Sequence, residues 1–294
     1  MGTNISTIYL TPQKLYFVVP QKNKLLHVKP FVWDEGTLVD IFGLLKKEFS
    51  IKKVKILISE EISYTTSFIS NTENLDRDMI AKHFRESVPD TILEAAWDYK
   101  VITTIGTVSL LQVFAVETTI WQLLQAAAKK HAISISMVLP TSYTVAHHLP
   151  EGHPPSLLLY VSREESFAAF LVQNHVFGIV SIDANQQQKS IEKITQLLEL
   201  MKQRYKITPQ LLLLPKKQKD VEMALPFLEI IKKRSTIPHP LHILAQSTIE
   251  SGNDADILTL SYEVEKKHNW ILLIISIFLL ALAISGTMLY LNSK

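Results

Sequence analysis

At the start of the chain, hydrophobic positions first follow the two-residue period of strands and then the longer period of a helix. Short runs rich in β-branched and aromatic residues at 6–10, 14–19 and 25–32 predict three strands, of which the first two form a hairpin. Hydrophobic residues at helical spacing in 35–49 predict an amphipathic helix, and the run at 54–58 predicts a buried strand. Strands, helix and strand in this order indicate an α/β fold.

The same order of elements continues through the middle of the chain and then repeats. Before a break at 150–155, the predicted elements are a helix at 75–88, strands at 97–103 and 107–116 that turn at Gly106, a helix at 120–130 capped by Thr118 or Thr119, and a strand at 133–139. After the break they are strands at 157–161, 167–172 and 176–182, a helix at 186–204, a strand at 211–214, a helix at 219–232 and a strand at 241–244. The repeated order predicts two lobes of related topology, residues 1–153 and 154–250.

The C-terminal part of the chain has neither period. Residues 270–291 form a run of 22 residues without a charge. A helix of this length spans ~33 Å, slightly more than the ~30 Å hydrocarbon core of a bilayer. Trp270 and Tyr290 stand at the two ends of the run, where aromatic side chains favour the membrane interface. The sequence therefore predicts one transmembrane helix at 270–291, and a buried core helix is the alternative.

The charges beside this run predict its orientation. Lys266 and Lys267 precede it, and only Lys294 follows it. Because lysine and arginine are retained on the cytoplasmic side, we expect the N-terminal part of the chain in the cytoplasm and the tail, 292–294, outside it. The N-terminus lacks the basic start and hydrophobic core of a signal peptide.

Composition argues against several kinds of site. A net charge of +2 over 294 residues is too small to indicate nucleic acid binding. The sequence has no cysteine, which excludes disulfides and thiolate chemistry, and no Gly-x-Ser-x-Gly or His-Glu-x-x-His motif. It therefore predicts no catalytic residue and no metal. His147, His148 and His153, with Glu151 nearby, are an alternative metal cluster, but a loop is the favoured interpretation.

One segment carries a resemblance to a known protein family. Residues 75–99 contain Phe84-Arg85-Glu86, then Val88-Pro89, then Trp97-Asp98-Tyr99. This succession resembles the helix, Ile-Pro and Asp-Tyr stretch of the actin-like type IV pilus protein PilM. Residues 116–146 are similar to that family's passage into its second lobe. The resemblance implies a two-lobed actin-like, ribonuclease H-like fold over most of residues 6–244.

The linker at 251–269 extends the resemblance. Ile257, Leu258 and Leu260, followed by Lys266-Lys267 and the hydrophobic run, resemble the start of the pilus protein PilN. Each of these three side chains gains about 2 kcal/mol on full burial. As the resemblance implies between two chains, we expect them to dock in a groove of the first lobe as an added strand or extended peptide. The alternative is an unstructured tether whose hydrophobic residues enter the membrane interface.

Type II secretion proteins called GspL join a PilM-like and a PilN-like part in one chain, as this sequence does. They continue into a periplasmic domain, whereas this sequence ends three residues after the hydrophobic run, as a shortened relative or a truncated sequence would. The resemblance implies a non-catalytic scaffold in the bacterial inner membrane. Its partners would be a cytoplasmic assembly or secretion ATPase and inner-membrane pilus or secretion proteins, and a homodimer is left open.

The turns that hold phosphates in working actin-like ATPases are poor in glycine here. The first candidate turn, 11–13, contains Pro12, which removes a backbone donor, and no glycine. The second, 162–166, places Glu164 and Glu165 where a polyanion would lie, and each like-charge contact costs on the order of 4 kcal/mol. We therefore expect no nucleotide cofactor.

Two other functions remain as alternatives. One is a membrane-bound actin-like ATPase that polymerises with nucleotide, similar to FtsA, although FtsA attaches through an amphipathic helix and the run at 270–291 has no polar face. The other is an unrelated α/β enzyme with a C-terminal anchor. Once the domain is anchored, the basic groups at 216–219 and 232–234 could touch anionic lipid, but solvated helix ends are the favoured interpretation.

Overall fold

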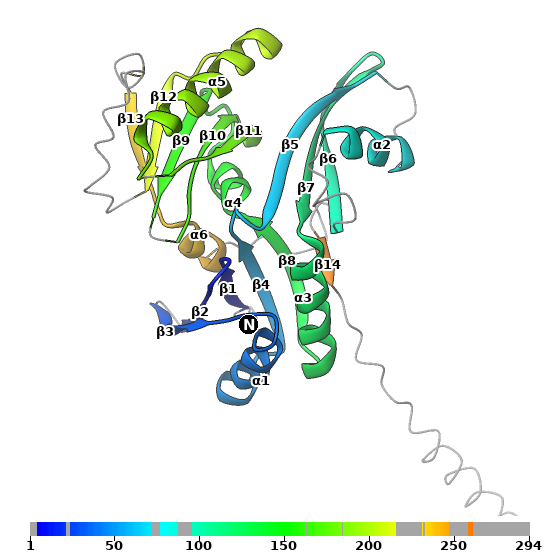
Figure 1. Ribbon diagram of the computed structural model, residues 1–294, viewed down its shortest axis with the longest axis vertical. Helices are drawn as coiled ribbons and strands as arrows, with labels where there is room; N and C mark the ends of the chain where they lie inside the picture. Colours follow the sequence, from blue (N-terminus) through cyan, green and yellow to red (C-terminus); the bar gives the residue numbers. More distant parts are fainter. Residues whose placement is uncertain are drawn as a thin grey trace, which may run out of the picture.

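The computed structural model describes residues 5–21, 24–71, 77–87, 96–162, 164–183, 185–215, 231, 233–246 and 258–260. These residues form three sheets of six, five and three strands. The two larger sheets belong to two lobes, and the three-stranded sheet stands to one side of both (Figure 1). Helices accompany each sheet, so the predicted α/β class is confirmed.

The first lobe is built on the six-stranded sheet. In chain order its strands are β1 (Ser6–Leu10), β2 (Lys14–Gln21), β3 (Lys24–Val32), β4 (Lys53–Ile58), β8 (Ser134–Pro140) and β14 (Leu258–Leu260). They lie in the order β14-β8-β4-β1-β2-β3. The strands β1, β4 and β8 run parallel, whereas β1, β2 and β3 form the predicted antiparallel meander.

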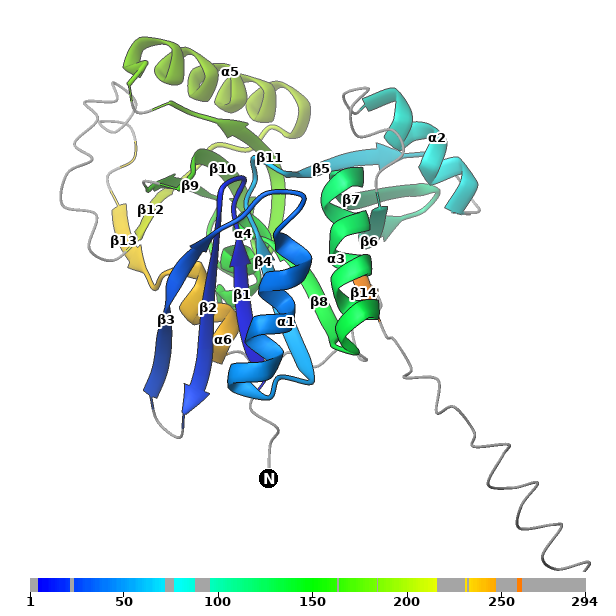
Figure 2. The same ribbon diagram turned by 60° about the horizontal axis from the view of Figure 1, so that its bottom comes forward.

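Two helices, α1 (Leu38–Phe49) and α3 (Thr118–His131), cover one face of this sheet (Figure 2). The hydrophobic stripe of α1 turns Leu38, Phe42 and Leu45 into the core beneath it. The two helices approach each other closely, because a Cβ atom at Gly43 would lie 2.6 Å from the ring of His131. Any larger residue at this position would displace that ring.

The second lobe is built on the five-stranded sheet. Its strands are β9 (Ser156–Val161), β10 (Ser166–Val172), β11 (His175–Ser181), β12 (Leu211–Pro215) and β13 (Lys233–Ile237), in the order β11-β10-β9-β12-β13. The long helix α5 (Gln187–Tyr205) packs Ile194, Leu197 and Met201 against this sheet. The meander of β9, β10 and β11 and the helix after it agree with the prediction.

Two short helices, α4 (Thr141–His148) and α6 (Pro240–Gln246), have neighbours in both lobes. Tyr143 and Leu244 belong to one cluster with side chains of β1, β4 and β8 in the first sheet. Val145 and Ile243 belong to another with side chains of β9, β10 and β12 in the second. Buried hydrophobic contacts through one pair of helices therefore hold the two lobes together.

The three-stranded sheet is an insertion between β4 and α3. It consists of β5 (Ser63–Ser70), β6 (Ala96–Ile105) and β7 (Val108–Val116) in the order β5-β7-β6, with the helix α2 (Arg77–Ser87) on one face. Ile80 and Phe84 of α2 are buried against β7. Gly106, with φ +61°, makes the predicted turn from β6 to β7.

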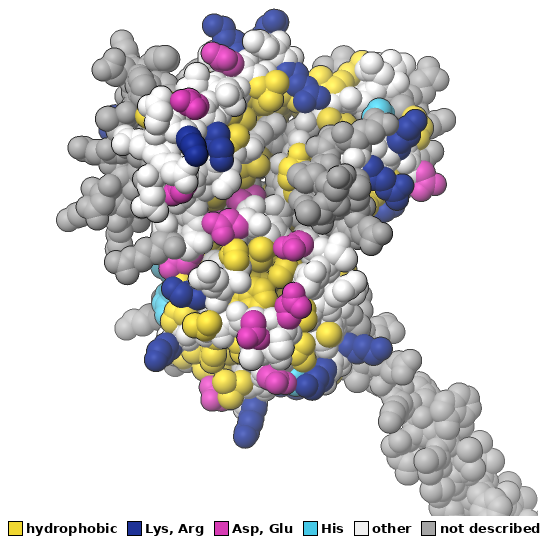
Figure 3. Space-filling view, in the orientation of Figure 1, with side chains coloured by type: hydrophobic (Ala, Val, Ile, Leu, Met, Phe, Trp, Pro, Cys, Tyr) yellow, Lys and Arg dark blue, Asp and Glu magenta, His cyan; other side chains and the backbone are white. Residues whose placement is uncertain are grey.

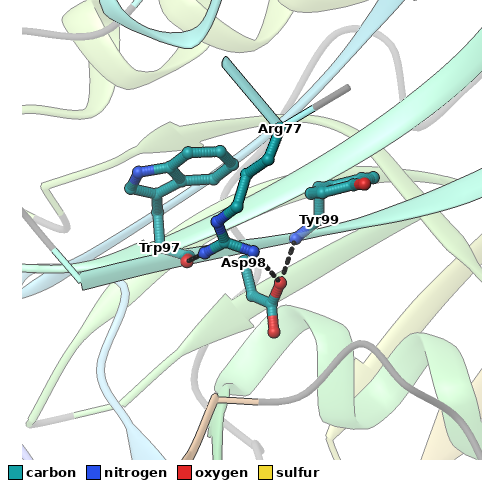
Figure 4. A network of polar contacts seen from close by, with 4 residues as sticks. All are labelled: Arg77, Trp97, Asp98 and Tyr99. Atoms are coloured by element: carbon teal, nitrogen blue, oxygen red, sulfur yellow. Dashed lines mark hydrogen bonds and ion pairs between the residues drawn. The ribbon is translucent and has the colours of Figure 1, made fainter. Parts of the chain in front are cut away.

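The Trp97-Asp98-Tyr99 stretch fastens α2 to this sheet (Figure 4). The guanidinium of Arg77 lies 4.4 Å from the centre of the Trp97 ring and donates to the Trp97 carbonyl oxygen at 2.9 Å. It also pairs with Asp98 at 3.3 Å, and Asp98 in turn accepts a hydrogen bond from the Tyr99 N–H at 3.0 Å.

The structure corrects three local predictions. Residues 241–244 were expected to form a strand but lie in the helix α6, since so short a hydrophobic run does not separate a buried strand from a buried helix. Thr118 and Thr119 do not cap α3, whose cap position is Glu117 without a side-chain cap bond. The strands β5 and β13 were not predicted. The predicted helix at 219–232 lies outside the described residues except for Ile231.

No helix in the described part of the chain is long and hydrophobic enough to span a bilayer. The predicted span at 270–291, with Trp270, Tyr290 and the topology residues Lys266 and Lys267, lies outside the described residues.

Candidate functional site between the two lobes

The two turns singled out as candidate phosphate loops use their polar groups internally. In the first, the Thr11 N–H donates to the Lys14 carbonyl oxygen at 2.9 Å, and the Lys14 N–H donates to the Thr11 hydroxyl at 3.1 Å. In the second, the N–H groups of Glu164 and Glu165 both donate to the Ser162 hydroxyl at 3.1 Å. These N–H groups are therefore not directed at a ligand, which is what a phosphate cradle requires.

The carboxylate of Glu165 instead enters the region between the lobes. The residue is only 3% exposed. Four donors from the first lobe surround its two oxygens: the hydroxyls of Tyr9 at 2.5 Å, Thr141 at 2.7 Å and Ser59 at 2.8 Å, and the Glu60 N–H at 2.8 Å. Because a carboxylate has about four lone-pair sites, this one is fully hydrogen-bonded.

The neighbouring Glu164 makes a second, more open contact across the same boundary. Its carboxylate accepts a hydrogen bond from the Tyr16 hydroxyl at 2.6 Å. Tyr16 stacks on Tyr9, with 5.7 Å between ring centres. Burial raises the pKa of both tyrosines, and their glutamate partners raise it further, so both hydroxyls remain protonated donors.

A second buried carboxyl group lies beside Glu165. The Oε1 atom of Glu60 accepts a hydrogen bond from the Ser142 N–H at 2.6 Å, at the first turn of α4, and its Oε2 atom is buried without a hydrogen-bond partner among the described residues. Burial and, next to it, the charge of Glu165 raise the pKa of Glu60, the Ser142 bond opposes both, and the resulting pKa is about 8.

The carboxyl groups of Glu60 and Glu165 together carry one negative charge near neutral pH. Burial raises the pKa of Glu165 as well, but its bonds to Thr141, Tyr9, Glu60 and Ser59 act in the opposite direction. The Glu60 N–H can only donate a hydrogen bond, and the three hydroxyls also donate to Glu165. Because donors favour the ionised form of a carboxyl group, Glu165 is the ionised member of the pair and Glu60 the protonated one. We call these residues, with Tyr9, Ser59 and Thr141, the interlobe glutamate cluster. Figure 3 shows Asp and Glu side chains gathered between the upper and lower parts of the molecule.

His239, just before α6, lies beside the cluster, with its ring centre 6.2 Å from that of Tyr9. His239 Nδ1 accepts a hydrogen bond from the Leu241 N–H at 3.2 Å, so its Nε2 carries the ring proton and donates to the Tyr160 hydroxyl at 3.0 Å. Burial lowers the pKa of His239 to about 4. The ring is therefore neutral at physiological pH and supplies no cation to offset Glu165.

The chain is similar to known proteins in its structure, whereas comparison of its sequence finds no match. No family model matches the chain, and no curated protein matches its sequence. The solved structures similar to it include a Bacteroides thetaiotaomicron protein with an actin-like ATPase fold and unknown function, a PilM-PilN type IV pilus biogenesis complex, and the cytoplasmic domain of EpsL, an inner-membrane component of the type II secretion system of Vibrio cholerae.

Each likeness covers most of both chains. The Bacteroides protein has a TM-score of 0.53 and 12% identity over 83% of this chain and 95% of its own. The pilus complex has a TM-score of 0.56 and 10% identity over 82% of this chain and 90% of its own. The EpsL domain has a TM-score of 0.50 and 11% identity over 84% of this chain and 96% of its own. The chain has the actin-like fold. The fold expected from the resemblance to PilM and GspL proteins is thus confirmed, at identities that show the fold alone.

In this actin-like chain the linker residues lie where an added strand would. The strand β14 (Leu258–Leu260) pairs antiparallel with β8, placing Leu258 opposite Val138 and Leu260 opposite Ile135. It is one of the two outer strands of the first sheet (Figure 1). Ile257 lies outside the described residues, and the side chains of Leu258 and Leu260 are not described. The energetic role of these three side chains therefore stays a prediction.

The histidine group does not come together as a metal site. His147 stacks on Tyr143 and, with Glu151, lines a pocket. His153 contacts the Pro154 carbonyl and Ser156, and His148 does not line that pocket. Within the part of the chain that the structure describes, no group of three or more His, Asp or Glu residues is arranged to hold a metal ion.

Sequence reasoning missed most of the cluster. It identified Glu164 and Glu165 by their position in a turn, but only as charges that repel phosphate. Nothing near them in the sequence points to Tyr9, Ser59 or Thr141. The one available signal was that two adjacent glutamates in a candidate phosphate-binding turn need hydrogen-bond partners if they are buried.

Replacing Glu165 by Gln should test how much the buried carboxylate holds the lobes together. The amide group would face donors in place of an oxygen, so we expect a loss of about 2–4 kcal/mol in the free energy of unfolding. Glu164→Gln, next to it, removes a carboxylate that accepts one hydrogen bond, from Tyr16; it is the matched control and should cost less than about 1 kcal/mol. Urea denaturation followed by circular dichroism measures both, and equal losses would contradict the assignment.

The raised pKa of Glu60 predicts a pH dependence of stability. In the unfolded chain the pKa is near 4.5 and in the folded chain about 8, so the folded state binds more protons between these values. Stability should therefore fall as pH rises from 4.5 towards 8, by at most about 1.4 kcal/mol per pH unit from this group. Glu60→Gln should flatten that slope in urea denaturation measured across the range. An unchanged slope would show that another group is responsible.

Proposed function

We propose that this chain is a non-catalytic scaffold of a type IV pilus or type II secretion machine, anchored in the bacterial inner membrane with its actin-like domain in the cytoplasm. Its function would be to connect a cytoplasmic assembly or secretion ATPase with inner-membrane components of the machine. The observation that carries this proposal is the Glu165 carboxylate, fully hydrogen-bonded between the lobes.

Glu165 supports a non-catalytic role because it competes with any nucleotide for the same space. To admit a polyphosphate, the carboxylate would have to leave four donors and expose them. An ejected Glu165 and the adjacent Glu164 would then repel the incoming phosphates. The cluster offers no cation among the described residues to compensate, since His239 is neutral. The interlobe region therefore favours a permanently closed arrangement.

The scaffold role is supported by the fold and by β14. The similar structures include a PilM-PilN complex and the cytoplasmic part of an inner-membrane secretion component. In this chain the PilN-like stretch follows the actin-like domain directly, and its backbone adds a strand to β8. A covalent link replaces a bimolecular encounter by a high effective concentration. The strand would thereby keep the domain close to the proposed membrane span at 270–291.

The competing function is an actin-like ATPase similar to FtsA, for which the fold itself is the favouring observation. Isothermal titration of the chain with ATP and Mg²⁺ separates the two. We expect no binding in the micromolar range, because the donors that would face the nucleotide already bind Glu165. Glu165→Gln serves as the comparison. Micromolar binding with phosphate release by the unmodified chain would favour the ATPase and overturn the scaffold proposal.

The docking of the linker can be tested by hydrogen exchange. We expect slow exchange through residues 255–262 and along β8 in the unmodified chain, because β14 pairs with β8. Leu258→Asp with Leu260→Asp should speed exchange in both segments while leaving the β9–β11 meander unchanged, since the latter belongs to the other sheet. Fast exchange in the unmodified chain would remove the docking hypothesis.

A further inference from the structure

A second groove lies away from the glutamate cluster, between the small sheet and the second lobe. Its volume is about 330 Å³, and it is bounded by β5, β11 and α5. Residues 64–67 of β5 and 177–180 of β11 line it, together with Lys193, Leu197, Leu200 and Arg204 of α5. In Figure 3 this hollow is lined by hydrophobic side chains, with Lys and Arg at its margin.

The groove runs between the edges of two sheets. Among the described strands, β5 pairs only with β7, and β11 only with β10. The two edges are joined near Val176, whose carbonyl oxygen accepts hydrogen bonds from the Ser67 hydroxyl at 2.6 Å and the Gln112 amide at 3.1 Å. Beyond this joint, Thr65 Oγ1 is buried in the groove wall without a hydrogen-bond partner among the described residues. Unpaired edges of this kind bind extended peptides by adding a strand.

The helix α5 gives the groove a hydrophobic floor with a cation at each end. Lys193, Leu197, Leu200 and Arg204 follow the helical period and share one face of α5. Leu197 is buried, whereas Leu200 is 49% exposed. None of the described residues that line the groove is acidic. The groove therefore complements a chain that is hydrophobic in the middle and negative on both sides.

The distance between the two cations limits the length of the occupant. Eleven positions along α5 separate Lys193 from Arg204, or about 16 Å at the rise of a helix. An extended chain covers this distance with about five residues. Side chains two positions apart in an extended chain share a face, so a carboxylate, a hydrophobic side chain and a second carboxylate at alternate positions match the floor.

We propose that the groove between β5, β11 and α5 binds an extended acidic segment of a partner protein, with an aliphatic residue over Leu200 and carboxylates at Lys193 and Arg204. The backbone of the segment would form hydrogen bonds with the edges of β5 and β11 beyond the joint at Val176, where neither edge pairs with another described strand. This site is independent of the scaffold role and of the membrane span, because it uses only described residues of these three elements.

A synthetic probe tests the site on the full chain. The probe is a fluorescein-labelled Gly-Asp-Thr-Leu-Thr-Glu-Gly peptide, and its charge-reversed partner carries Lys in place of Asp and Glu. In fluorescence anisotropy we expect the acidic peptide to bind and the basic peptide not to bind. The amides of residues 64–67 and 177–180 should exchange more slowly in the complex.

Variants locate the binding within the groove. Arg204→Glu and Leu200→Asp should each weaken binding by about tenfold or more. Lys202→Glu makes the same charge reversal on α5 outside the groove lining and should leave the affinity unchanged, with circular dichroism confirming that each variant folds. No binding of the acidic peptide up to about 0.5 mM chain, equal binding of both peptides, or an equal loss in Lys202→Glu would overturn the proposal.

Discussion

The arrangement of this molecule depends on how one buried carboxylate is accommodated. Glu165 is removed from water, and no cation among the described residues pairs with it, which would cost several kcal/mol if its oxygens were not satisfied. The donors that satisfy it come from β1, from the loop after β4 and from the start of α4. The turn of the second lobe is therefore anchored on the first lobe.

The helices α4 and α6 reinforce this anchor from the hydrophobic side. Each contributes to the core clusters of both lobes, so a movement that opened the lobes would expose side chains of two cores. The polar and hydrophobic contacts thus favour the same closed arrangement. Binding surfaces are then to be sought at sheet edges, where β14 already extends one sheet and where β5 and β11 leave a groove.

The fold constrains the amino-acid sequence less than a binding site does. Structures with 10% to 12% identity share the architecture over more than four-fifths of this chain. Sheet order and core packing tolerate such change because many hydrophobic side chains fill the same space. A binding site does not, because it needs particular donors at particular positions. In this chain the polar groups of the interlobe glutamate cluster bind one another.

The sequence by itself determined the elements whose patterns are local. The meanders β1–β3 and β9–β11, the helices α1 and α5 and the turn at Gly106 follow from period and turn chemistry within a few residues. It did not reveal β5, whose Ser63, Thr65 and Ser67 are buried polar residues, because only packing against the rest of the molecule buries them. For the same reason the hydrophobic run at 241–244 was assigned to a strand, although it forms a helix between two sheets. The role of Glu165 was decided by tertiary structure alone. Its partner Tyr9 is 156 positions away, and no local pattern encodes a hydrogen bond that exists only once two lobes have met.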